Sequence, residues 1–287
     1  MLGRYITRAV DAQSRWSKPL GDFNHRWLAA IFHPLRPIQN FLNGTWLGHP
    51  VHAAVTDVPI GAMTVSLIAD LIGQHVVADV SLLVGVLAMV ASAVTGAADY
   101  VEVDGTARNR ATVHSAIMVV ALVVYALSLL IRSGAPGDRL LPIVLSVIGY
   151  LLLTVGAEIG GDLVYLAGTH VDRHAWRGAG TKWLKVDLGD LPDIPEGGPT
   201  KLKVGINEIA VVRNGDRILA VHAQCAHAGG PLAEGSLVGD GIECPWHGSR
   251  FRLADGHVVR GPSMYAQPAY DVRRAEAGGW EARRQAG

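Results

Sequence analysis

The stretch VSLLVGVLAMVASAVTGAA (residues 80–98) decides much of the fold, because it includes no charged side chain. A helix of about 20 apolar residues, rising 1.5 Å per residue, crosses the roughly 30 Å of hydrocarbon in a bilayer. Three further stretches are comparable, at residues 53–71, 114–131 and 140–157. Buried helices of a soluble bundle should each show a polar face, and the second and third stretches show almost none. The sequence therefore predicts four transmembrane helices.

The composition agrees with a membrane protein. Of 287 residues, 49% are hydrophobic and only 17% are charged, against about a quarter charged in typical soluble domains. Lys and Arg number 25, as do Asp and Glu, and this zero net charge argues against a nucleic-acid partner. Two cysteines exclude a disulfide-rich scaffold. The length suits about two domains.

Short connections between the four stretches predict an up-down bundle of antiparallel neighbours. The segment before the first helix carries six Lys or Arg side chains, whereas the loops on the opposite side offer only Arg132 and Arg139. Because cytoplasmic segments are enriched in Lys and Arg, we expect both termini to face the cytoplasm. The chain is then a multi-pass protein of the inner membrane, in contact with lipid.

Residues 1–48 form a basic, partly amphipathic N-terminal segment. Trp16, Phe23, Trp27 and Phe32 are interleaved with the basic residues, a pattern that suits a helix lying on the membrane surface. A loosely folded tail is the alternative. The four-helix domain follows over residues 49–168.

After residue 168 the sequence changes character. A polar linker at 169–181 precedes a domain at 182–284 with no helical period. Short strand-like runs occupy 183–186, 200–204, 208–213 and 217–222, and Asn214-Gly215 between the last two is a strong hairpin signal. The predicted fold class is thus a four-helix transmembrane bundle followed by an all-β domain.

The most specific motif of the chain lies in this β domain. Cys225-Ala226-His227 is followed, after the intervening segment 228–243, by Cys244-Pro245-Trp246-His247-Gly248-Ser249. Two Cys–His pairs on separate loops suit a [2Fe–2S] cluster in which thiolates bind one iron and imidazoles the other. A structural zinc site is the alternative, although zinc pairs usually read C-x₂₋₄-C or H-x₃₋₅-H.

With this motif, residues 182–284 resemble a Rieske [2Fe–2S] domain, a stack of antiparallel sheets with the cluster at its tip. The resemblance implies that Cys225 and Cys244 bind one iron, and that His227 and His247 bind the other. Gly261-Pro262-Ser263 corresponds to the loop that covers the cluster in this family.

The departures from respiratory Rieske proteins are informative. No spare cysteine is present for their disulfide, which suits a reducing compartment. Ser249 stands where a serine hydrogen-bonds a cluster sulfide in high-potential members, whereas Phe251 replaces a tyrosine. One retained and one lost hydrogen bond predict a potential of about −150 to +150 mV.

Polar residues near the ends of the membrane stretches are a second candidate site. Gly48-His49-Pro50-Val51-His52 resembles the start of a family of small four-helix membrane proteins, and that resemblance implies no established activity. The further candidates are His114, Glu158 and His170. They could ligate haem b, with His52 and His114 as the first pair, bind another metal ion, or only form hydrogen bonds.

These features predict a membrane-anchored carrier of single electrons between a reductase or quinol and an unidentified acceptor. The sequence predicts an electron carrier of the oxidoreductase type rather than a complete catalyst. No phosphate-binding glycine motif follows a strand and opens a helix, so no flavin or nicotinamide site is predicted and a separate donor is needed. A redox sensor and a subunit of a membrane oxygenase are the alternatives. Only one histidine, His257, follows His247, too few for the catalytic iron domain of a ring-hydroxylating oxygenase.

Overall fold

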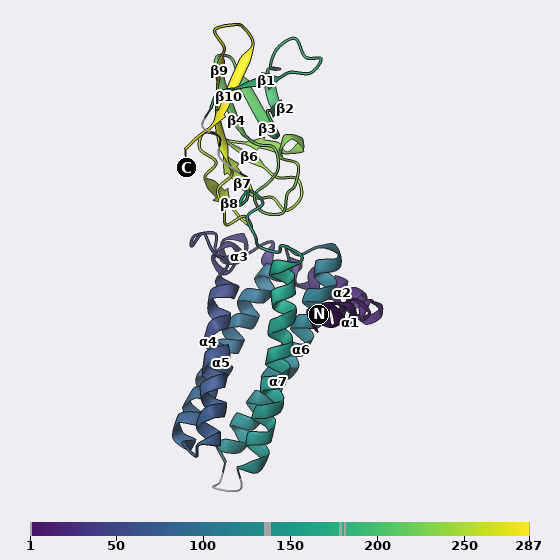
Figure 1. The fold of residues 1–287 in the computed structure, drawn as a ribbon, viewed down its shortest axis with the longest axis vertical. Helices are drawn as coiled ribbons and strands as arrows, with labels where there is room; N and C mark the ends of the chain where they lie inside the picture. The colour runs from purple at the N-terminus through teal and green to yellow at the C-terminus, as the bar shows by residue number, and fades with distance from the viewer. Residues whose placement is uncertain (1, 135–138, 178–179, 181, 287) are drawn as a thin grey trace. The chain divides into compact units, whose positions relative to one another are not determined.

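The computed structural model describes residues 2–134, 139–177, 180 and 182–286 (Figure 1). The chain divides into two compact units. The helical unit comprises Met1–Asn43 and Pro50–Thr169, and the β unit comprises Gly44–His49 and His170–Gly287. The predicted linker at 169–181 is thus largely part of the β unit, with residues 178–179 and 181 outside the described ranges.

The predicted four-helix bundle is confirmed. Four helices of the described chain are long and apolar enough to span a membrane: α4 Val51–Leu71, α5 His75–Tyr100, α6 Gly105–Arg132 and α7 Leu140–Tyr165. All four extend beyond the apolar stretches seen in the sequence. The reason is that hydropathy marks only the part at lipid depth, and α6 continues through polar residues that pack under the N-terminal helices.

The bundle is built from two tightly packed hairpins, α4 with α5 and α6 with α7. Figure 1 shows the four helices running side by side. Glycines allow the close approach within each hairpin: a Cβ at Gly85 would lie 2.6 Å from Met63, and one at Gly149 would lie 2.9 Å from Tyr125. Because α4 also contacts α7 and α5 also contacts α6, the helices form a square in which α4 and α6 are diagonal.

A buried ion network ties the hairpins together at the end of the bundle where α4 ends and α5 begins. Arg132 Nη2 lies 2.6 Å from Asp70 Oδ2, and the two side chains are 1% and 0% exposed. Arg132 Nη1 also donates to Asp79 at 2.9 Å, and Asp79 is in turn paired with Arg139. The network joins all four helices, so both charges of the buried pair are compensated.

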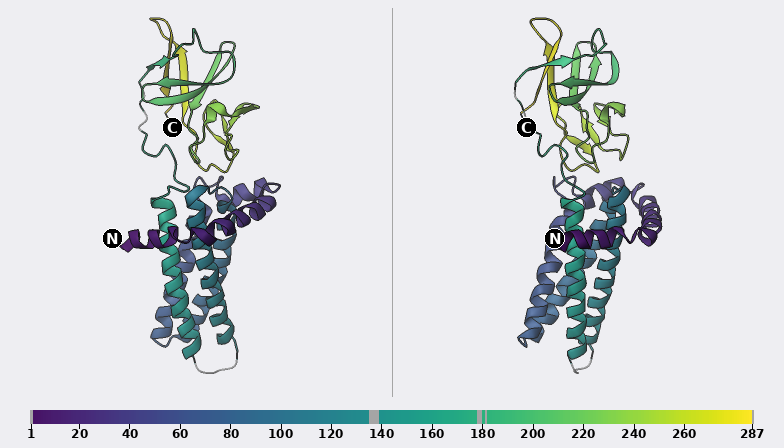
Figure 2. Two further views of the ribbon diagram at one scale, coloured as in Figure 1. Left: turned by 90° about the vertical axis from the view of Figure 1, so that its right-hand side faces the viewer. Right: turned by 45° about the vertical axis from the view of Figure 1, so that its right-hand side comes forward.

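The N-terminal segment is helical in the structure rather than a loosely folded tail. Its helices are α1 Leu2–Asp11, α2 Ser14–Phe32 and α3 Arg36–Asn43, and Figure 2 shows α1 and α2 crossing the bundle. Arg110 on α6 binds Asp11 with two hydrogen bonds of 2.8 and 2.9 Å. Phe23 and Trp27 remain 59% and 58% exposed, as in a helix that lies at a lipid surface.

The β unit consists of a closed barrel and a smaller sheet. The barrel has the strand order β1-β10-β9-β4-β3-β2, and the sheet has the order β5-β6-β7-β8. The strands are β1 Leu184–Asp187, β2 Gly197–Val204, β3 Asn207–Asn214, β4 Arg217–His222, β5 Ser236–Val238, β6 Gly241–Glu243, β7 Arg250–Arg252, β8 Val258–Arg260, β9 Ala269–Arg274 and β10 Trp280–Arg284. The predicted all-β character is confirmed.

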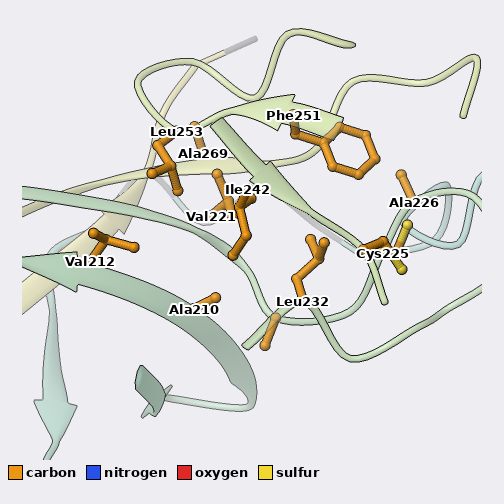
Figure 3. Packing of buried hydrophobic residues seen from close by; sticks show 12 residues of the cluster. Ala210, Val212, Val221, Cys225, Ala226, Leu232, Ile242, Phe251, Leu253 and Ala269 are labelled. Carbon is orange, nitrogen blue, oxygen red and sulfur yellow. The ribbon is translucent and has the colours of Figure 1, made fainter. Parts of the chain in front are cut away.

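Strand prediction succeeded for the longer strands. All four predicted runs coincide with β1 to β4, and Asn214 pairs with Arg217 across the predicted hairpin. The strands β5 to β8 have three residues each, too few for an alternating pattern to be visible. Their side chains nevertheless complete a buried apolar cluster that includes Ile242, Phe251 and Cys225 (Figure 3).

Candidate metal centre

The two Cys–His motifs occupy two loops of the β unit. The first loop follows β4, and the second connects β6 to β7. The strands β6 and β7 pair antiparallel, with Gly241 opposite Arg252 and Glu243 opposite Arg250, and this pairing holds the two ends of the second loop together. The motif residues are therefore fixed by short strands rather than by a long flexible segment.

Both loops are closed by the same backbone hydrogen bonds. In each, the cysteine N–H donates to the carbonyl five residues later, and the cysteine carbonyl accepts from the N–H four residues later. The four bonds are Cys225 N to Gly230 O at 2.8 Å, Gly229 N to Cys225 O at 2.9 Å, Cys244 N to Ser249 O at 2.8 Å and Gly248 N to Cys244 O at 3.0 Å. The loops are conformational equivalents despite their different sequences.

A glycine at the fifth position makes this frame possible. Gly229 has φ +83° and Gly248 has φ +74°, a left-handed conformation that costs other residues about 1–2 kcal/mol. The glycine therefore occupies the same place in both loops. Sequence reasoning noticed the donors but not this shared turn.

The donor side chains form two pairs. The Cys225 and Cys244 thiols are buried, at 1% and 3% exposure, and are not joined by a disulfide. The His227 and His247 rings meet edge to face with centroids 5.0 Å apart. Within the described residues, no three His, Cys, Asp or Glu side chains surround a single point as one metal ion requires. Two sulfurs and two imidazoles in separate pairs suit a two-iron cluster better than a zinc ion.

The loop backbone favours negative charge on sulfur. The Cys225 thiol and the N–H groups of Trp246 and His247 lower the pKa of Cys244 to about 6, against desolvation that acts in the opposite direction. The N–H groups of His227 and Ala228 act on Cys225 in the same way, although the neighbouring Cys244 sulfur and burial raise the pKa of Cys225 overall. The pair is arranged to hold thiolates once a metal supplies positive charge.

The two histidines differ in their surroundings. His227 is 7% exposed, and burial together with the neighbouring His247 holds its pKa well below the ordinary range. His247 is half-buried, and the Trp246 ring beside it is 59% exposed. The neutral form that a metal requires is therefore favoured at His227, while His247 lies on the accessible side.

Two residues near the thiols fit a bulky group. A Cβ at Gly230 would lie 2.7 Å from Cys244 Sγ, so only glycine lets the first loop approach this sulfur so closely. Ser249 is fully buried, and its Oγ accepts a hydrogen bond of 3.0 Å from Ser263 N. Its own hydroxyl proton is then available to a sulfide, as the resemblance implies. Phe251, also fully buried, offers no hydroxyl group.

Gln267 holds the first loop in place, a role that sequence reasoning missed. Its side chain is 1% exposed and accepts a hydrogen bond of 2.8 Å from Ala226 N. Its amide nitrogen donates to the carbonyls of His222 and Gln224, each at 2.7 Å. One side chain thus satisfies three backbone groups around Cys225. A single glutamine between two strands carries no sequence pattern that indicates this.

The linker also packs on the first loop. His174 Nε2 lies 2.8 Å from the Gln224 carbonyl, and Arg173 N donates to the Ala226 carbonyl at 3.2 Å. The carbonyl of His170 accepts a hydrogen bond of 2.9 Å from Tyr265 Oη. These residues at the start of the β unit therefore support the metal centre.

The candidates of the membrane stretches are distributed over both units. His49 and His170 belong to the β unit. Glu158 is exposed on α7, and its carboxylate lies near Gly3 of α1. His52 on α4 and His114 on α6 both belong to the bundle, and each binds a backbone carbonyl of the neighbouring helix. These two histidines are thus the candidates of the helical unit that share one kind of anchor.

Comparison with known proteins divides the chain at the same place. Residues 183–271 match the family described as Rieske [2Fe-2S] domain, and residues 48–173 match the family described as Predicted membrane protein (DUF2231). The His-Pro-x-His motif itself is not part of what these matches establish.

Several curated proteins and solved structures resemble the β unit. Ferredoxin CarAc of Metapseudomonas resinovorans is 35% identical over 95 residues, which are 33% of this chain and 87% of the relative. The ferredoxin component of the naphthalene 1,2-dioxygenase/salicylate 5-hydroxylase systems of Ralstonia sp is 34% identical over 31% of this chain and 85% of the relative. The ferredoxin of carbazole 1,9a-dioxygenase from Nocardioides aromaticivorans IC177 matches with 32% identity and a TM-score of 0.28, over 32% of this chain and 88% of that structure.

Proposed function

Since the chain belongs to the Rieske [2Fe-2S] family through residues 183–271, we propose that it is a membrane-anchored protein that transfers single electrons through one [2Fe–2S] cluster. The β unit is a Rieske ferredoxin-like electron-carrier domain. The helical unit is a membrane domain, as its family match and four apolar helices indicate.

The observation that carries the proposal is the pair of equivalent loops, which bring two thiols and two imidazoles together as separate pairs. Cys225 and Cys244 would hold one iron through sulfur, and His227 and His247 would hold the other through nitrogen. The bound cluster supplies one-electron redox chemistry. The loop N–H groups favour negative charge at the Cys244 sulfur, and the buried Ser249 hydroxyl, which accepts from Ser263 N, would donate to a sulfide of the cluster.

The electron enters and leaves on the side of His247. This ring is half-buried and has the exposed Trp246 beside it, whereas His227 is buried. A ring N–H on this side can donate to a redox partner and can exchange a proton with solvent. The acceptor we propose is an oxygenase, because two of the relatives are named as ferredoxin components of dioxygenase systems.

The donor and the location complete the proposal. A soluble reductase or a membrane quinol supplies the electron, and a quinol is accessible to a protein embedded in lipid. The Lys and Arg distribution supports an inner-membrane protein whose β unit faces the cytoplasm. The absence of a cysteine pair for a disulfide suits that compartment.

A redox or metal group in the bundle, haem b included, is a second part of the proposal. His52 and His114 are the residues that could serve it, because they share one unit and face neighbouring helices in the same way.

Electron paramagnetic resonance of the reduced full-length protein in detergent tests the cluster assignment. We expect a rhombic Rieske signal and about two non-haem irons per chain. Cys225→Ser and His247→Ala should lose the signal, and the exposed His257→Ala is the matched control that should keep it. A signal that persists in both ligand variants would exclude these residues as ligands.

The potential separates the carrier from a redox sensor. A carrier needs a midpoint potential that cellular donors can reach, which we place at about −150 to +150 mV from the Ser249 and Phe251 pattern. A well-formed cluster that exchanges electrons with no reductase or quinol on the time scale of turnover would contradict the carrier proposal and favour the sensor.

A further inference from the structure

His52 and His114 make the same kinds of contact in the two hairpins: each ring binds a backbone carbonyl and packs against a glycine of the neighbouring helix. His52 Nδ1 lies 2.9 Å from the Ser92 carbonyl of α5, and a Cβ at Gly96 would lie 2.9 Å from its ring. His114 Nδ1 lies 2.8 Å from the Gly156 carbonyl of α7, and a Cβ at Gly160 would lie 3.3 Å from its ring. In both hairpins the acceptor carbonyl stands four residues before the glycine.

This similarity extends along the whole length of the helices. Contact positions of α4 recur in α6 at one constant offset in the sequence, and those of α5 recur in α7 at a second constant offset. The corresponding contacts are His52 to Ser92 and His114 to Gly156, Met63 over Gly85 and Tyr125 over Gly149, and Ser66 to the Ala78 carbonyl and Ser128 to the Pro142 carbonyl. The bundle is therefore an internal repeat of two hairpins, which the sequence alone did not disclose.

The repeat fixes how the two histidines are related. Because α4 and α6 run in the same direction on diagonal corners of the square, an approximate two-fold axis parallel to the helices relates the hairpins. His52 and His114 are equivalent positions, so they lie at the same depth on opposite sides of this axis. Two imidazoles in this relation can approach one group from its two faces.

The hydrogen bonds also fix the state of both rings. A carbonyl oxygen only accepts, so each neutral imidazole carries its proton on Nδ1 and a lone pair on Nε2. Among the described residues neither Nε2 has a hydrogen-bond partner, and both rings are half-buried. An N–H to a backbone carbonyl is the usual support of a metal-bound histidine.

The number of donors indicates which group fits. A zinc or copper ion needs three or four protein ligands, and no cluster of three His, Cys, Asp or Glu occurs in the described part of the chain. In a haem the porphyrin supplies four nitrogen ligands to the iron, so the protein needs to supply only one or two more. Two equivalent imidazoles, with no third donor among the residues that the structure describes, therefore favour a haem over a free ion.

We propose that His52 and His114 are the two axial ligands, through Nε2, of one b-type haem in the bundle. The inference rests on the second part of the proposed function, and it is independent of the cluster and its ligands. It assigns to the helical unit a redox role besides anchoring.

The test is a pyridine haemochrome assay and a reduced-minus-oxidised spectrum of the full-length protein, expressed with a haem precursor and purified in detergent. We expect one b-type haem per chain, with a sharp α-band. His52→Ala and His114→Ala should each lose it, whereas His75→Ala, an exposed histidine at the other end of the bundle, should retain it. The rhombic cluster signal should persist in all three, which shows that the β unit is intact, and an unchanged helical circular-dichroism spectrum in detergent should show that the bundle is folded.

A second pair of variants separates ligation from structural damage. His52→Met and His114→Met keep a ligand at each position, so they should retain haem with a raised potential. Wild-type protein without haem but with an intact cluster would overturn the inference and leave the electron carrier standing. Bound zinc or copper in place of haem, or haem retained in the His52→Ala/His114→Ala double variant, would also overturn it. Haem retained in Cys225→Ser protein would show that failure of the cluster assignment leaves the haem inference intact.

Discussion

The β unit and the helical unit each contain one local arrangement twice, but the contacts that build the arrangement differ. In the β unit two loops share a frame of backbone hydrogen bonds around Cys225 and Cys244. In the helical unit two hairpins share side-chain contacts that recur at constant offsets along the chain. The loops orient donors by turning the backbone, whereas the helices orient them by anchoring Nδ1 to a neighbour.

This difference explains why the sequence shows the paired loops but not the repeated hairpins. A loop frame depends on particular residues close together, so Cys-x-His and Cys-x-x-His appear as a motif. A helix repeat depends on small residues and a few polar ones spread among interchangeable apolar residues. Substitutions in each unit should distinguish donors that are oriented by loop backbone from donors that are oriented by contacts between helices.

The largest effect is expected in the bundle, at Arg132. Arg132→Ala leaves Asp70, which is 0% exposed, with only Arg139 at 3.7 Å. Removing one partner of a buried pair costs about 3–5 kcal/mol, and we expect the lower end of that range here. Thermal unfolding in detergent should show a large decrease in Tm, while the cluster potential stays unchanged. Arg139→Ala, at a 28% exposed side chain, is the control with a smaller effect; equal losses would contradict the prediction.

A smaller effect is expected in the β unit, at Gln267. Gln267→Ala leaves the Ala226 N–H and two carbonyls around Cys225 without their partner. Unsatisfied buried polar groups cost about 1–3 kcal/mol, so the cluster should be lost faster on dilution into urea. The decay of its visible absorbance measures this, and the unfolding temperature of the bundle should not change. Gln285→Ala, at a half-buried glutamine whose amide donates to the Ala254 carbonyl and to Asp271, should decay at the wild-type rate. A wild-type rate for Gln267→Ala would show that this side chain does not stabilise the first loop.

The β unit should also lose stability in mild acid. Burial, with the nearby His174, Arg177 and Arg284, lowers the pKa of His222 from 6.5 to about 3. Between pH 6.5 and 3 the unfolded chain therefore binds a proton at His222 that the folded unit does not bind. The contribution of neutral His222 to the free energy of unfolding is complete above pH 6.5 and is lost as the pH falls toward 3. At pH 5.5 this amounts to about 1.4 kcal/mol. Urea midpoints at pH 7.5 and 5.5 should differ less in His222→Gln than in wild type or His257→Gln; an unchanged difference would exclude His222 as the cause.

The smallest stability change, and the sharpest comparison, concerns two glycines of the bundle. Gly61→Ala adds a Cβ with nothing within 4 Å, whereas Gly96→Ala places one 2.9 Å from the His52 ring. Alanine is favoured in a helix by up to about 1 kcal/mol, so Gly61→Ala should stabilise slightly. Gly96→Ala should be close to neutral, because ring displacement offsets that gain, yet it should weaken any group bound at His52. Equal spectra and equal Tm values for the two variants would contradict this.

Sequence reasoning reached the four helices, the strands β1 to β4 and the Cys–His motif, because hydropathy, alternation and short spacings are local signals. It named His52 and His114 as a candidate pair near the ends of the membrane stretches. It could not find their anchors, since the Ser92 and Gly156 carbonyls belong to the backbone of other helices. It missed Gln267 for a similar reason, because its contacts reach backbone groups far away in the sequence.

The Asp70–Arg132 pair has a consequence for how such a bundle assembles. The two residues occupy equivalent positions of the repeat, one on α4 and the other on α6. Two copies of the first hairpin would bring two carboxylates together, and two copies of the second would oppose two guanidinium groups, each arrangement without compensation in a medium of low dielectric constant. Opposite charges at one repeated position thus make the first hairpin complementary to the second, and they prevent two identical hairpins of neighbouring molecules from pairing with each other.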